Sequence, residues 1–309
     1  MSKTCLGILG GGQLGSFLAQ AAKKLKIKTI VYCDDTDAPA KYFADDIIIG
    51  SYDETKKIDK FIKKIDLVTF EFENIPYDIL STINKKKRVL PSPYINQLIQ
   101  NRFTEKNFIN DLSLKTTNFE LIKNFSDLRN NKNLLPGILK TCTLGYDGKG
   151  QYVISTIEDA EKLDISFNNE FILEKKIELK KEISVIVTRY GKNKFETYEP
   201  IENVHKDQIL SVSQIPAKID KLINDQSIFW SQKIAEKLDF IGTMCVEFFL
   251  DKDDKLLVNE IAPRVHNSGH LTLNSHNVSQ FENHVRAVCG LQKVSTKKIY
   301  NAKMINLIG

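Results

Sequence analysis

Cysteine is scarce in this sequence, and its spacing suits neither a disulfide framework nor a zinc site. The 309 residues include five cysteines, an odd number, and no Cys-x-x-Cys pair occurs among them. Disulfide frameworks and structural zinc sites need closely and regularly spaced cysteines. We therefore expect reduced thiols in a cytoplasmic protein. The five are Cys5, Cys33, Cys142, Cys245 and Cys289.

Long apolar runs and dense charge of one sign are also missing. A membrane-spanning helix needs a run of about 18 apolar residues, and none occurs. The segment Thr4–Leu9 already has the pattern of a core strand, so we expect no signal peptide. The net charge of +5 comes mostly from scattered lysines, and Lys85–Arg88 is the one dense basic run. A solvated helix end explains that run better than a nucleic-acid surface, so we expect neither nucleic acid nor a membrane as partner.

The composition that remains is that of an ordinary globular protein. Hydrophobic residues make up 42% of the chain and charged residues 27%. The length is sufficient for two domains or three small ones. No internal repeat and no low-complexity segment is visible.

The first hundred residues have the pattern of an open parallel sheet. The strand Thr4–Leu9 is followed by Gly10–Gly15, which has G-x-G-x-x-G spacing, then by an amphipathic helix and a second strand, Thr29–Tyr32. Such glycines let amides at a helix N-terminus approach a phosphate. The motif suits a dinucleotide or a single phosphate, so a dinucleotide dehydrogenase stays open as an alternative at this point.

Three further strands, with helices between them, are expected in the rest of these first hundred residues. Ligands of an open parallel sheet bind at the carboxyl ends of its strands. Glu71–Asn74 follow such an end, where a ligand site and a plain turn are equally good interpretations. The expected strands are Asp46–Ile49, Leu67–Phe70 and Val89–Leu90, and the helices lie near 55–64 and 77–85.

The composition changes after a connecting helix, Arg102–Asp111. Segment 144–150, Leu-Gly-Tyr-Asp-Gly-Lys-Gly, joins two short strands and follows Lys140. Three glycines and a lysine suit a flap that closes over phosphates, and a plain hairpin loop is the alternative. It is not a Walker loop, because no Gly-Lys-Ser/Thr follows. The strands predicted in this small α+β unit are Phe119–Ile122, Ile138–Thr141, Gln151–Ile154 and Phe171–Lys175.

The densest polar chemistry lies in residues 242–270. A strand over Gly242–Leu250 contains Glu247, and a second strand from Leu256 leads into Asn259 and Glu260. If a two-residue turn at Asp253-Asp254 joins these strands, Glu247 faces Glu260. Opposed carboxylates destabilise a sheet unless a cation lies between them, and Mg²⁺ takes one or two carboxylates together with phosphates. The alternative is a solvent-facing edge where the two glutamates never meet.

The elements around this hairpin complete the C-terminal half. A strand over Glu182–Tyr190 and a helix over Ile219–Leu238, with Trp230 on its apolar side, precede it. A capping box at Ser279–Glu282 predicts a helix that ends near Val288. The run Met304–Gly309 has the pattern of a strand.

Taken together, these motifs resemble the ATP-grasp superfamily and, within it, the family of 5-(carboxyamino)imidazole ribonucleotide synthases. The resemblance implies mixed α/β and α+β structure, an ATP-grasp fold preceded by a Rossmann-like parallel-sheet domain. It implies domains at 1–100 (Rossmann-like), 101–177 (linker helix and lid) and 178–309 (catalytic subdomain). The family continues beyond the last motif, so we expect a C-terminally short chain, and Leu144 stands where the family usually has glycine. The motifs are Gly10–Gly15, Glu71–Asn74, Gly145–Gly150, Asn259–His270 and Met304–Gly309.

The resemblance implies an enzyme of de novo purine (IMP) biosynthesis. Such an enzyme uses ATP and bicarbonate, with Mg²⁺, to carboxylate the amine of 5-aminoimidazole ribonucleotide through carboxyphosphate. A homodimer is expected. The alternatives are a formate-dependent glycinamide ribonucleotide transformylase, whose loop lacks the order Arg-x-His-Asn-Ser-Gly-His found at 264–270, and a nucleotide-binding remnant.

The resemblance also implies roles for individual residues. In the ATP site, phosphates contact Arg102, Lys140 and the flap residues Gly145, Tyr146, Asp147, Gly148, Lys149, Gly150 and Gln151. Adenine and ribose contact Glu174, Lys175, Lys176, Ile177 and Glu182, and His205 and Asn259 line the site. The metal ligands are Glu247 and Glu260. The ribonucleotide substrate contacts Gln13, Leu14, Glu73 and Asn267, and the catalytic set is Arg264, His266, Asn267 and Lys140.

Overall fold

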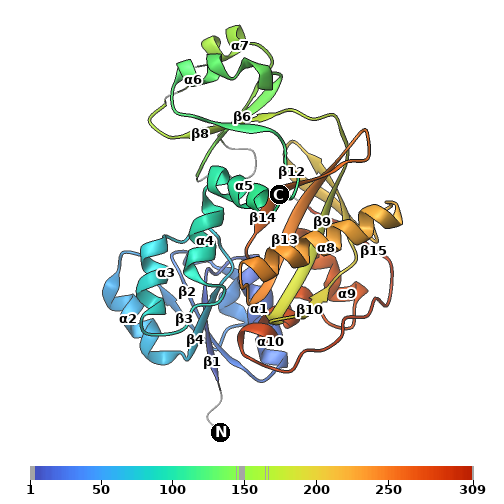
Figure 1. Cartoon of the computed structure of the whole chain (residues 1–309). Coiled ribbons are helices and arrows are strands. Elements are labelled where there is room, and N and C mark those ends of the chain that lie inside the picture. Colours follow the sequence, from blue (N-terminus) through green and yellow to red (C-terminus); the bar gives the residue numbers. More distant parts are fainter. Residues whose placement is uncertain (1–3, 144, 146–149, 164, 166, 308–309) are drawn as a thin grey trace.

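The computed structural model describes residues 4–143, 145, 150–163, 165 and 167–307. Within them the chain forms three sheets, which Figure 1 shows as a lower N-terminal unit, an upper lid and a central unit beside them. This arrangement confirms the predicted combination of a parallel-sheet domain with an ATP-grasp fold. Among the described helices, none has the length and apolar character needed to cross a membrane.

The N-terminal sheet is parallel throughout and has the strand order β3-β2-β1-β4. Its strands have near-continuous apolar runs because helices cover both faces of a parallel sheet. The predicted strand Val89–Leu90 is wrong: Val89 makes only an isolated bridge to Val68, and Pro91 has no N–H to extend the pairing. The elements are β1 Cys5–Leu9, α1 Gln13–Lys24, β2 Lys28–Cys33, β3 Asp46–Ile49, α2 Thr55–Lys64, β4 Leu67–Phe70 and α3 Tyr77–Asn84.

The lid is an antiparallel sheet that follows two connecting helices. Asn101 caps the second helix, its side chain accepting hydrogen bonds from the amides of Phe103 and Thr104. The lid strands have the order β5-β8-β6-β7 and bury a small core of their own. The elements are α4 Pro93–Gln100, α5 Arg102–Asp111, β5 Phe119–Ile122, α6 Phe125–Asn130, β6 Gly137–Thr141, β7 Gln151–Ile154, α7 Ile157–Lys162 and β8 Phe171–Lys175.

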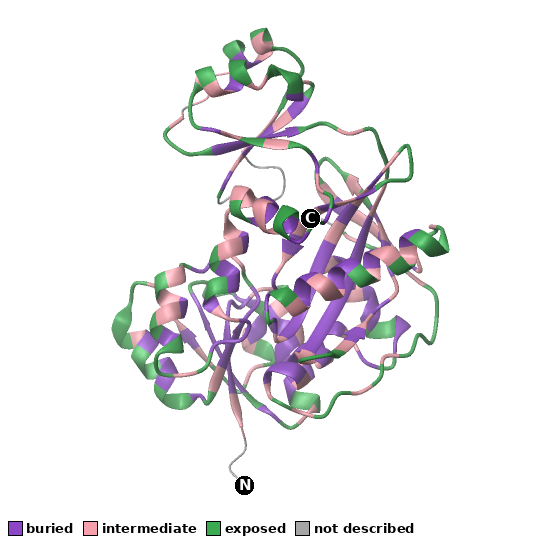
Figure 2. Cartoon of the chain, in the orientation of Figure 1, coloured by how far each residue is buried: buried purple, intermediate pink, exposed green. Residues whose placement is uncertain are grey.

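The central sheet has the order β14-β13-β9-β11-β12-β15, with β10 paired to β9. Helix α8 packs its apolar side, with Trp230 and Ile234, on this sheet against Val246 and Val258. Figure 2 shows the middle of β9 and most of β13 as buried ribbons. The elements are β9 Leu179–Gly191, β10 Lys194–Thr197, β11 Ile201–Lys206, β12 Ile209–Ile215, α8 Lys221–Lys237, β13 Gly242–Asp251, β14 Leu256–Ala262, α9 Thr272–Ser275, α10 Gln280–Val288 and β15 Ala302–Ile305.

Helix α10 joins the N-terminal sheet to the central sheet. Its Phe281 and Val285 pack in the same apolar cluster as Leu18 of α1. Its buried His284 accepts a hydrogen bond from the Thr243 amide at Nδ1 (3.0 Å), and its Nε2 lies 2.7 Å from the Thr69 hydroxyl. Burial lowers the pKa of His284 to about 4. The imidazole is therefore neutral at physiological pH and bridges β13 to β4.

The hairpin of β13 and β14 pairs Glu247 with Glu260 as predicted, but by a different route. The two-residue turn predicted at Asp253-Asp254 is wrong. The Asp251 amide bonds to the Lys255 carbonyl around a three-residue loop, and Asp254 has a φ of 58°. The register then shifts by one, because Phe248 pairs with Val258 and Glu247 with Glu260. Asn259 is thus the extra residue of a β-bulge, which offsets the difference in the turn.

Candidate active site

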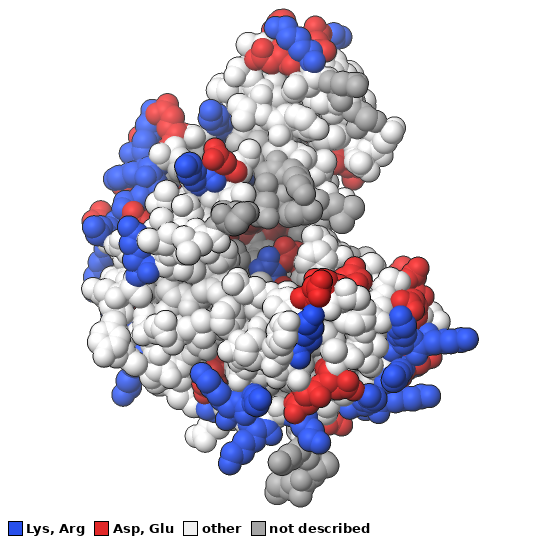
Figure 3. Space-filling model, turned by 180° about the vertical axis from the view of Figure 1, so that it is seen from behind, with Lys and Arg blue, Asp and Glu red and all other residues white. Residues whose placement is uncertain are grey.

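A cleft of about 1270 Å³ opens between the lid, the N-terminal sheet and the central sheet. Figure 3 shows it from behind as a hollow below the upper lobe, with basic and acidic side chains in its depth. Most of the residues predicted for the site line it. They are Gln13, Leu14, Glu73, Arg102, Lys140, Gly145, Gln151, Glu182, His205, Glu247, Asn259, Glu260, Arg264, His266 and Asn267.

Arg102 and Glu260 form an ion pair at the centre of the cleft. Arg102 Nη1 donates to Glu260 Oε2 at 2.9 Å, and Nη2 donates to the Gly145 carbonyl at 3.2 Å. Burial raises the pKa of Glu260, but Arg102 lowers it by a larger amount, so the pKa lies below its usual value. Burial lowers the pKa of Arg102, and Glu260 more than reverses this. Both groups are therefore charged where the linker helix meets β14.

Lys140 is held by a buried carboxylate, Glu174. Its Nζ lies 3.1 Å from Glu174 Oε1, and the Nζ of Lys106 lies 3.5 Å from Oε2. Burial raises the pKa of Glu174, but Lys106 and Lys140 together outweigh burial and lower it to about 2. Glu174 thus lies behind Lys140 and fixes the direction of its ammonium group. Lys106 also donates to the Thr116 hydroxyl (2.9 Å) and to the Asn259 carbonyl (3.2 Å) at the bulge.

Sequence reasoning missed the two buried charged residues of α5, Glu105 and Lys106. Glu105 accepts a hydrogen bond from the Ile261 amide at 2.6 Å, and burial and then Glu260 raise its pKa to about 8. Burial lowers the pKa of Lys106, although Glu174 opposes that shift. One signal in the sequence was available: Lys106 is four residues after Arg102 and therefore lies on the same helix face.

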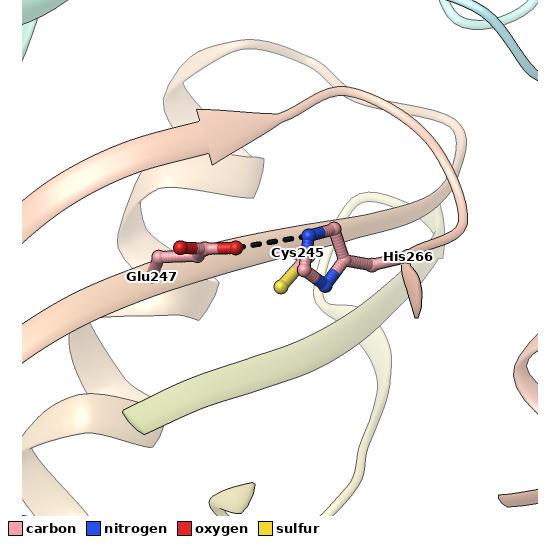
Figure 4. A group of neighbouring side chains, drawn as sticks. All are labelled: Cys245, Glu247 and His266. Carbon is pink, nitrogen blue, oxygen red and sulfur yellow. Dashed lines mark ion pairs between the residues drawn. The ribbon is translucent and has the colours of Figure 1, made fainter. Parts of the chain in front are cut away.

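His266 pairs with the second glutamate of the hairpin. Its Nε2 lies 2.9 Å from Glu247 Oε1, and its Nδ1 lies 2.9 Å from the Ser268 hydroxyl. Figure 4 shows Glu247 and His266 pointing toward one another, with the sulfur of Cys245 beside the imidazole ring. Burial lowers the pKa of His266, but Cys245 and Glu247 raise it well above its ordinary value. The two opposed glutamates therefore each face a cationic group of the chain itself.

The loop after β14 meets the N-terminal sheet through an ion pair between Arg264 and Glu73. Burial raises the pKa of Glu73, and Arg264 lowers it by more, so its pKa falls below the usual range. Glu73 is one of the four residues predicted to hold the ribonucleotide substrate. Another, Asn267, lies in the same loop and also lines the cleft.

The glycine loop is packed against Glu71. The Gly12 amide donates to Glu71 Oε1 at 2.7 Å, and a side chain at Gly10 would lie 2.7 Å from this glutamate. Gly10 also has a φ of +98°, which disfavours any other residue. Burial is the main cause of the raised pKa of Glu71. The glycines therefore serve close packing on Glu71, while Gln13 and Leu14 line the cleft.

The remaining predicted residues fall into four groups. Glu182 and His205 form an ion pair on the central sheet, and Glu182 raises the pKa of His205 although burial opposes it. Lys175 and Lys176 are exposed at the end of β8 and, with Ile177, are not among the described residues that line the cleft. Gly150 lies next to Thr141 with a φ of +71°. Leu144, Tyr146, Asp147, Gly148 and Lys149 lie outside the described residues.

Two family models match the chain. Residues 2–100 match the ribonucleotide synthetase preATP-grasp domain, and residues 107–281 match the ATP-grasp domain. The second match begins within α5 and spans the lid and most of the central sheet.

Curated proteins and solved structures are similar to nearly the whole chain. The N5-carboxyaminoimidazole ribonucleotide synthase of Bacillus subtilis is 38% identical over 98% of this chain and 81% of its own length, and that of Brucella melitensis is 38% identical over 98% and 85%. The Staphylococcus aureus N5-carboxyaminoimidazole synthetase in complex with ADP matches with a TM-score of 0.93, at 37% identity over 99% of this chain and 82% of that one. The Aspergillus clavatus enzyme in complex with ADP and 5-aminoimidazole ribonucleotide matches with a TM-score of 0.91, at 29% identity over 99% and 82%.

Proposed function

Because the chain belongs to the N5-carboxyaminoimidazole ribonucleotide synthase family of ATP-grasp enzymes, we propose from this premise how its cleft performs the reaction. The protein is an ATP-dependent ligase that carboxylates 5-aminoimidazole ribonucleotide in purine biosynthesis. The observation that supports the following assignments is the convergence of three sheets on one cleft. Lys140 comes from the lid, Glu247 and Glu260 from the central sheet, and Glu73 from the N-terminal sheet.

ATP binds between the lid and the central sheet. Arg102 and Lys140 are directed at its phosphates, since each cation is held in place by a carboxylate, Glu260 in the cleft and the buried Glu174. Flap residues Gly145–Gln151 cover the phosphates, and Glu174–Ile177 with Glu182 bind adenine and ribose. Fixed cations of this kind stabilise the charge that develops during phosphoryl transfer.

The hairpin offers a suitable site for Mg²⁺. Glu247 and Glu260 are paired across β13 and β14, and their acceptor-only oxygens are the donors that a hard cation prefers. The ion, when bound, neutralises phosphate charge and helps to position the transferred group. Arg102 pairs with Glu260 and His266 with Glu247, so each carboxylate has a cationic partner before the ion arrives. Asn259, beside Glu260, also lines the cleft.

Bicarbonate and the ribonucleotide bind toward the N-terminal sheet. A bicarbonate oxygen attacks the γ-phosphorus of ATP, the bond to the bridging oxygen breaks, and carboxyphosphate and ADP result. The substrate amine then bonds to the carboxyl carbon, phosphate leaves and the nitrogen loses a proton. Arg264 and His266 hold bicarbonate, Asn267 orients the amine, and Gln13, Leu14 and Glu73 bind the phosphate and ribose. Carboxyphosphate is short-lived in water, which gives a closing lid its purpose.

A product assay tests this assignment. ADP release is measured with ATP, bicarbonate and 5-aminoimidazole ribonucleotide, with each omitted in turn. Release that needs all three supports the proposal. Release with formate and glycinamide ribonucleotide in their place would favour the transformylase alternative, and ATP binding without any release would favour a nucleotide-binding remnant.

Domain limits, assembly and location are proposals of the same kind. We place the domains at 1–100, 101–177 and 178–309, and we expect a homodimer in the cytoplasm. Five free thiols support a reducing compartment. Sedimentation at several concentrations tests the dimer.

A further inference from the structure

Cys245, Glu247 and His266 bring three different ligand types to one point. Cys245 and Glu247 are two residues apart on β13, so their side chains leave the same face of the strand. His266 comes from the loop that follows β14. Among the described residues, these three form the group whose potential ligand atoms all lie within 4.8 Å of one another (Figure 4).

The imidazole is oriented by a buried chain of hydroxyl and amide groups. Its Nδ1 lies 2.9 Å from the Ser268 hydroxyl, which lies 2.8 Å from the hydroxyl of Ser184. Asn203 in turn donates to the Ser184 hydroxyl at 2.9 Å. Metal-binding histidines in proteins usually have a hydrogen-bonded partner of this kind at the other ring nitrogen, because it fixes the ring. Here it directs Nε2 at Glu247 and leaves that nitrogen available to a metal.

We propose that Cys245, Glu247 and His266 form a binding site for a thiophilic divalent cation of the zinc class. Sulfur, imidazole nitrogen and carboxylate oxygen are the three donor types that Zn²⁺ takes in proteins. Mg²⁺ prefers oxygen alone, so the thiol distinguishes the two ions. When zinc binds, the Cys245 S–H and the His266 Nε2–H are replaced by bonds to the metal, and both protons pass to solvent.

The observed spacing is compatible with this site after small side-chain rotations. Sulfur and nitrogen ligands of a tetrahedral zinc lie about 3.6 Å apart. Because all the ligand atoms lie within 4.8 Å of one another, no pair has to close by more than about an ångström, which rotation of Glu247 and Cys245 supplies. Cys245 is fully buried, whereas Glu247 and His266 line the cleft. The metal thus enters from the cleft, and a water or substrate oxygen completes its coordination there.

One consequence rests on the proposed function. Glu247 is the residue assigned to Mg²⁺, and His266 is assigned to bicarbonate. A zinc ion bound here occupies both groups and inhibits turnover until a chelator removes it. Excess Mg²⁺ competes for Glu247 alone, so it relieves the inhibition only in part.

Cobalt titration of the full chain tests binding without reference to turnover. Co²⁺ replaces Zn²⁺ and gives a near-ultraviolet sulfur-to-cobalt charge-transfer band only if a thiolate is bound. We expect this band in the wild type, its loss in Cys245→Ala, and its displacement by Zn²⁺. Cys142→Ala is the matched control, because Cys142 is a second thiol that lines the cleft, and the band should persist there. Zn²⁺ affinity should fall about tenfold or more in Cys245→Ala.

The inhibition assay then separates the two proposals. Zn²⁺ should inhibit the wild type and Cys142→Ala alike, and Cys245→Ala should retain turnover while resisting Zn²⁺. No band in the wild type, or a band that survives in Cys245→Ala, overturns the zinc site. A wild type that shows the band but no turnover contradicts the proposed function and leaves the site standing. If Cys245→Ala does not fold, Cys245→Ser preserves the volume and should also lose the sulfur band.

Discussion

Two junctions position the cleft, and they are built from opposite chemistry. The lid meets the central sheet through charged groups. Glu174 of β8 lies buried between Lys106 and Lys140, and Arg102 pairs with Glu260 in the cleft. Apart from the Arg264–Glu73 ion pair at the cleft, the N-terminal sheet meets the central sheet through a junction that we call neutral, made of the imidazole of His284 and an apolar cluster on α1 and α10. The charged junction lies beside the proposed phosphate site, where fixed cations are needed. The neutral junction lies away from it and needs only to pack.

Substitutions of the two hairpin glutamates should have the largest effects on turnover. They also distinguish an arginine partner from a histidine partner. Glu247→Gln and Glu260→Gln should each lower turnover about a hundredfold to a thousandfold, because each removes an anionic oxygen ligand from the proposed Mg²⁺ site and so weakens the neutralisation of phosphate charge. Their stabilities should differ. Arg102 cannot lose its proton, and the Glu260 side chain is 40% exposed, so Glu260→Gln also lowers the free energy of unfolding by about 1–3 kcal/mol. His266 can lose its proton, so Glu247→Gln should leave stability nearly unchanged.

Turnover and denaturant unfolding of both variants provide the measurement. Near-normal turnover in either variant at ordinary Mg²⁺ would refute the metal assignment. Equal losses of stability in both would refute the distinction between arginine and histidine.

Glu174→Gln tests whether the lid junction depends on charge. The change leaves Lys106 and Lys140 buried without a counter-charge, and the free energy of unfolding should fall by about 3–5 kcal/mol. Glu170→Gln is the control on the same lid. Its 2.9 Å pair with Lys123 is solvent-exposed, so this change should leave the free energy of unfolding nearly unchanged. Urea unfolding of both variants measures the difference, and similar values for the two would argue against a charged junction.

Acid should weaken the neutral junction before the charged one. The pKa of His284 is about 4 in the folded chain and has an ordinary value of 6.5. Between these values the unfolded chain binds a proton that the folded chain does not, so stability falls as pH drops, by about 3 kcal/mol at pH 4. Glu174, with a pKa of about 2 against an ordinary 4.5, contributes its full stabilisation above pH 4.5 and loses it only as the pH falls from there toward 2.

Comparison with His284→Gln isolates this histidine, since glutamine can still accept from Thr243 and donate to Thr69. Unfolding free energies of both proteins are measured from pH 7 to pH 4. The wild type should lose about 3 kcal/mol more than the variant over this range. Parallel curves would show that His284 does not titrate as expected.

The smallest effect concerns the helix cap at the neutral junction. The Ser279 side chain accepts a hydrogen bond from the Glu282 amide at 3.2 Å and caps α10. Ser279→Ala should lower the free energy of unfolding by about 1 kcal/mol, and Ser279→Asp should keep it. In the lid, Asn124→Ala removes the cap of α6 in the same way. A loss in thermal stability from Ser279→Ala that Ser279→Asp shares would mean that capping is not the cause.

The sequence predicted the elements with strong periodicity and the residues with unusual chemistry. Helix Arg102–Asp111 and the lid strands lie where expected, because local pattern decides them. The pairing of Glu247 with Glu260 was also predicted. The bulge at Asn259 was not predicted, because it compensates for a three-residue loop in place of the expected two-residue turn. That loop depends on the left-handed backbone of Asp254, and no glycine or asparagine in the loop indicates such a conformation.

Contacts between distant segments were out of reach for the same reason. A lysine in a helix is usually exposed, so the sequence gives no reason to expect Lys106 to be buried. Its burial depends on the ion pair with Glu174, 68 positions later in the chain. His284 has its two partners in β4 and β13. Contacts between residues far apart in the sequence produce no periodic pattern. The charge and burial of the residues at both junctions could therefore be identified only from the structure.

The bulge at Asn259 changes the parity of β14. Before the bulge the even-numbered residues Leu256 and Val258 point into the core, and after it the odd-numbered Ile261 does. Asn259 and Glu260 are left as two successive residues that both face the cleft. With the register of the turn continued unbroken, Glu260 would pair with Val246 and point at the apolar core. A single extra residue in β14 thus places the Glu260 carboxylate in the cleft without any change in the three-residue loop at 252–254.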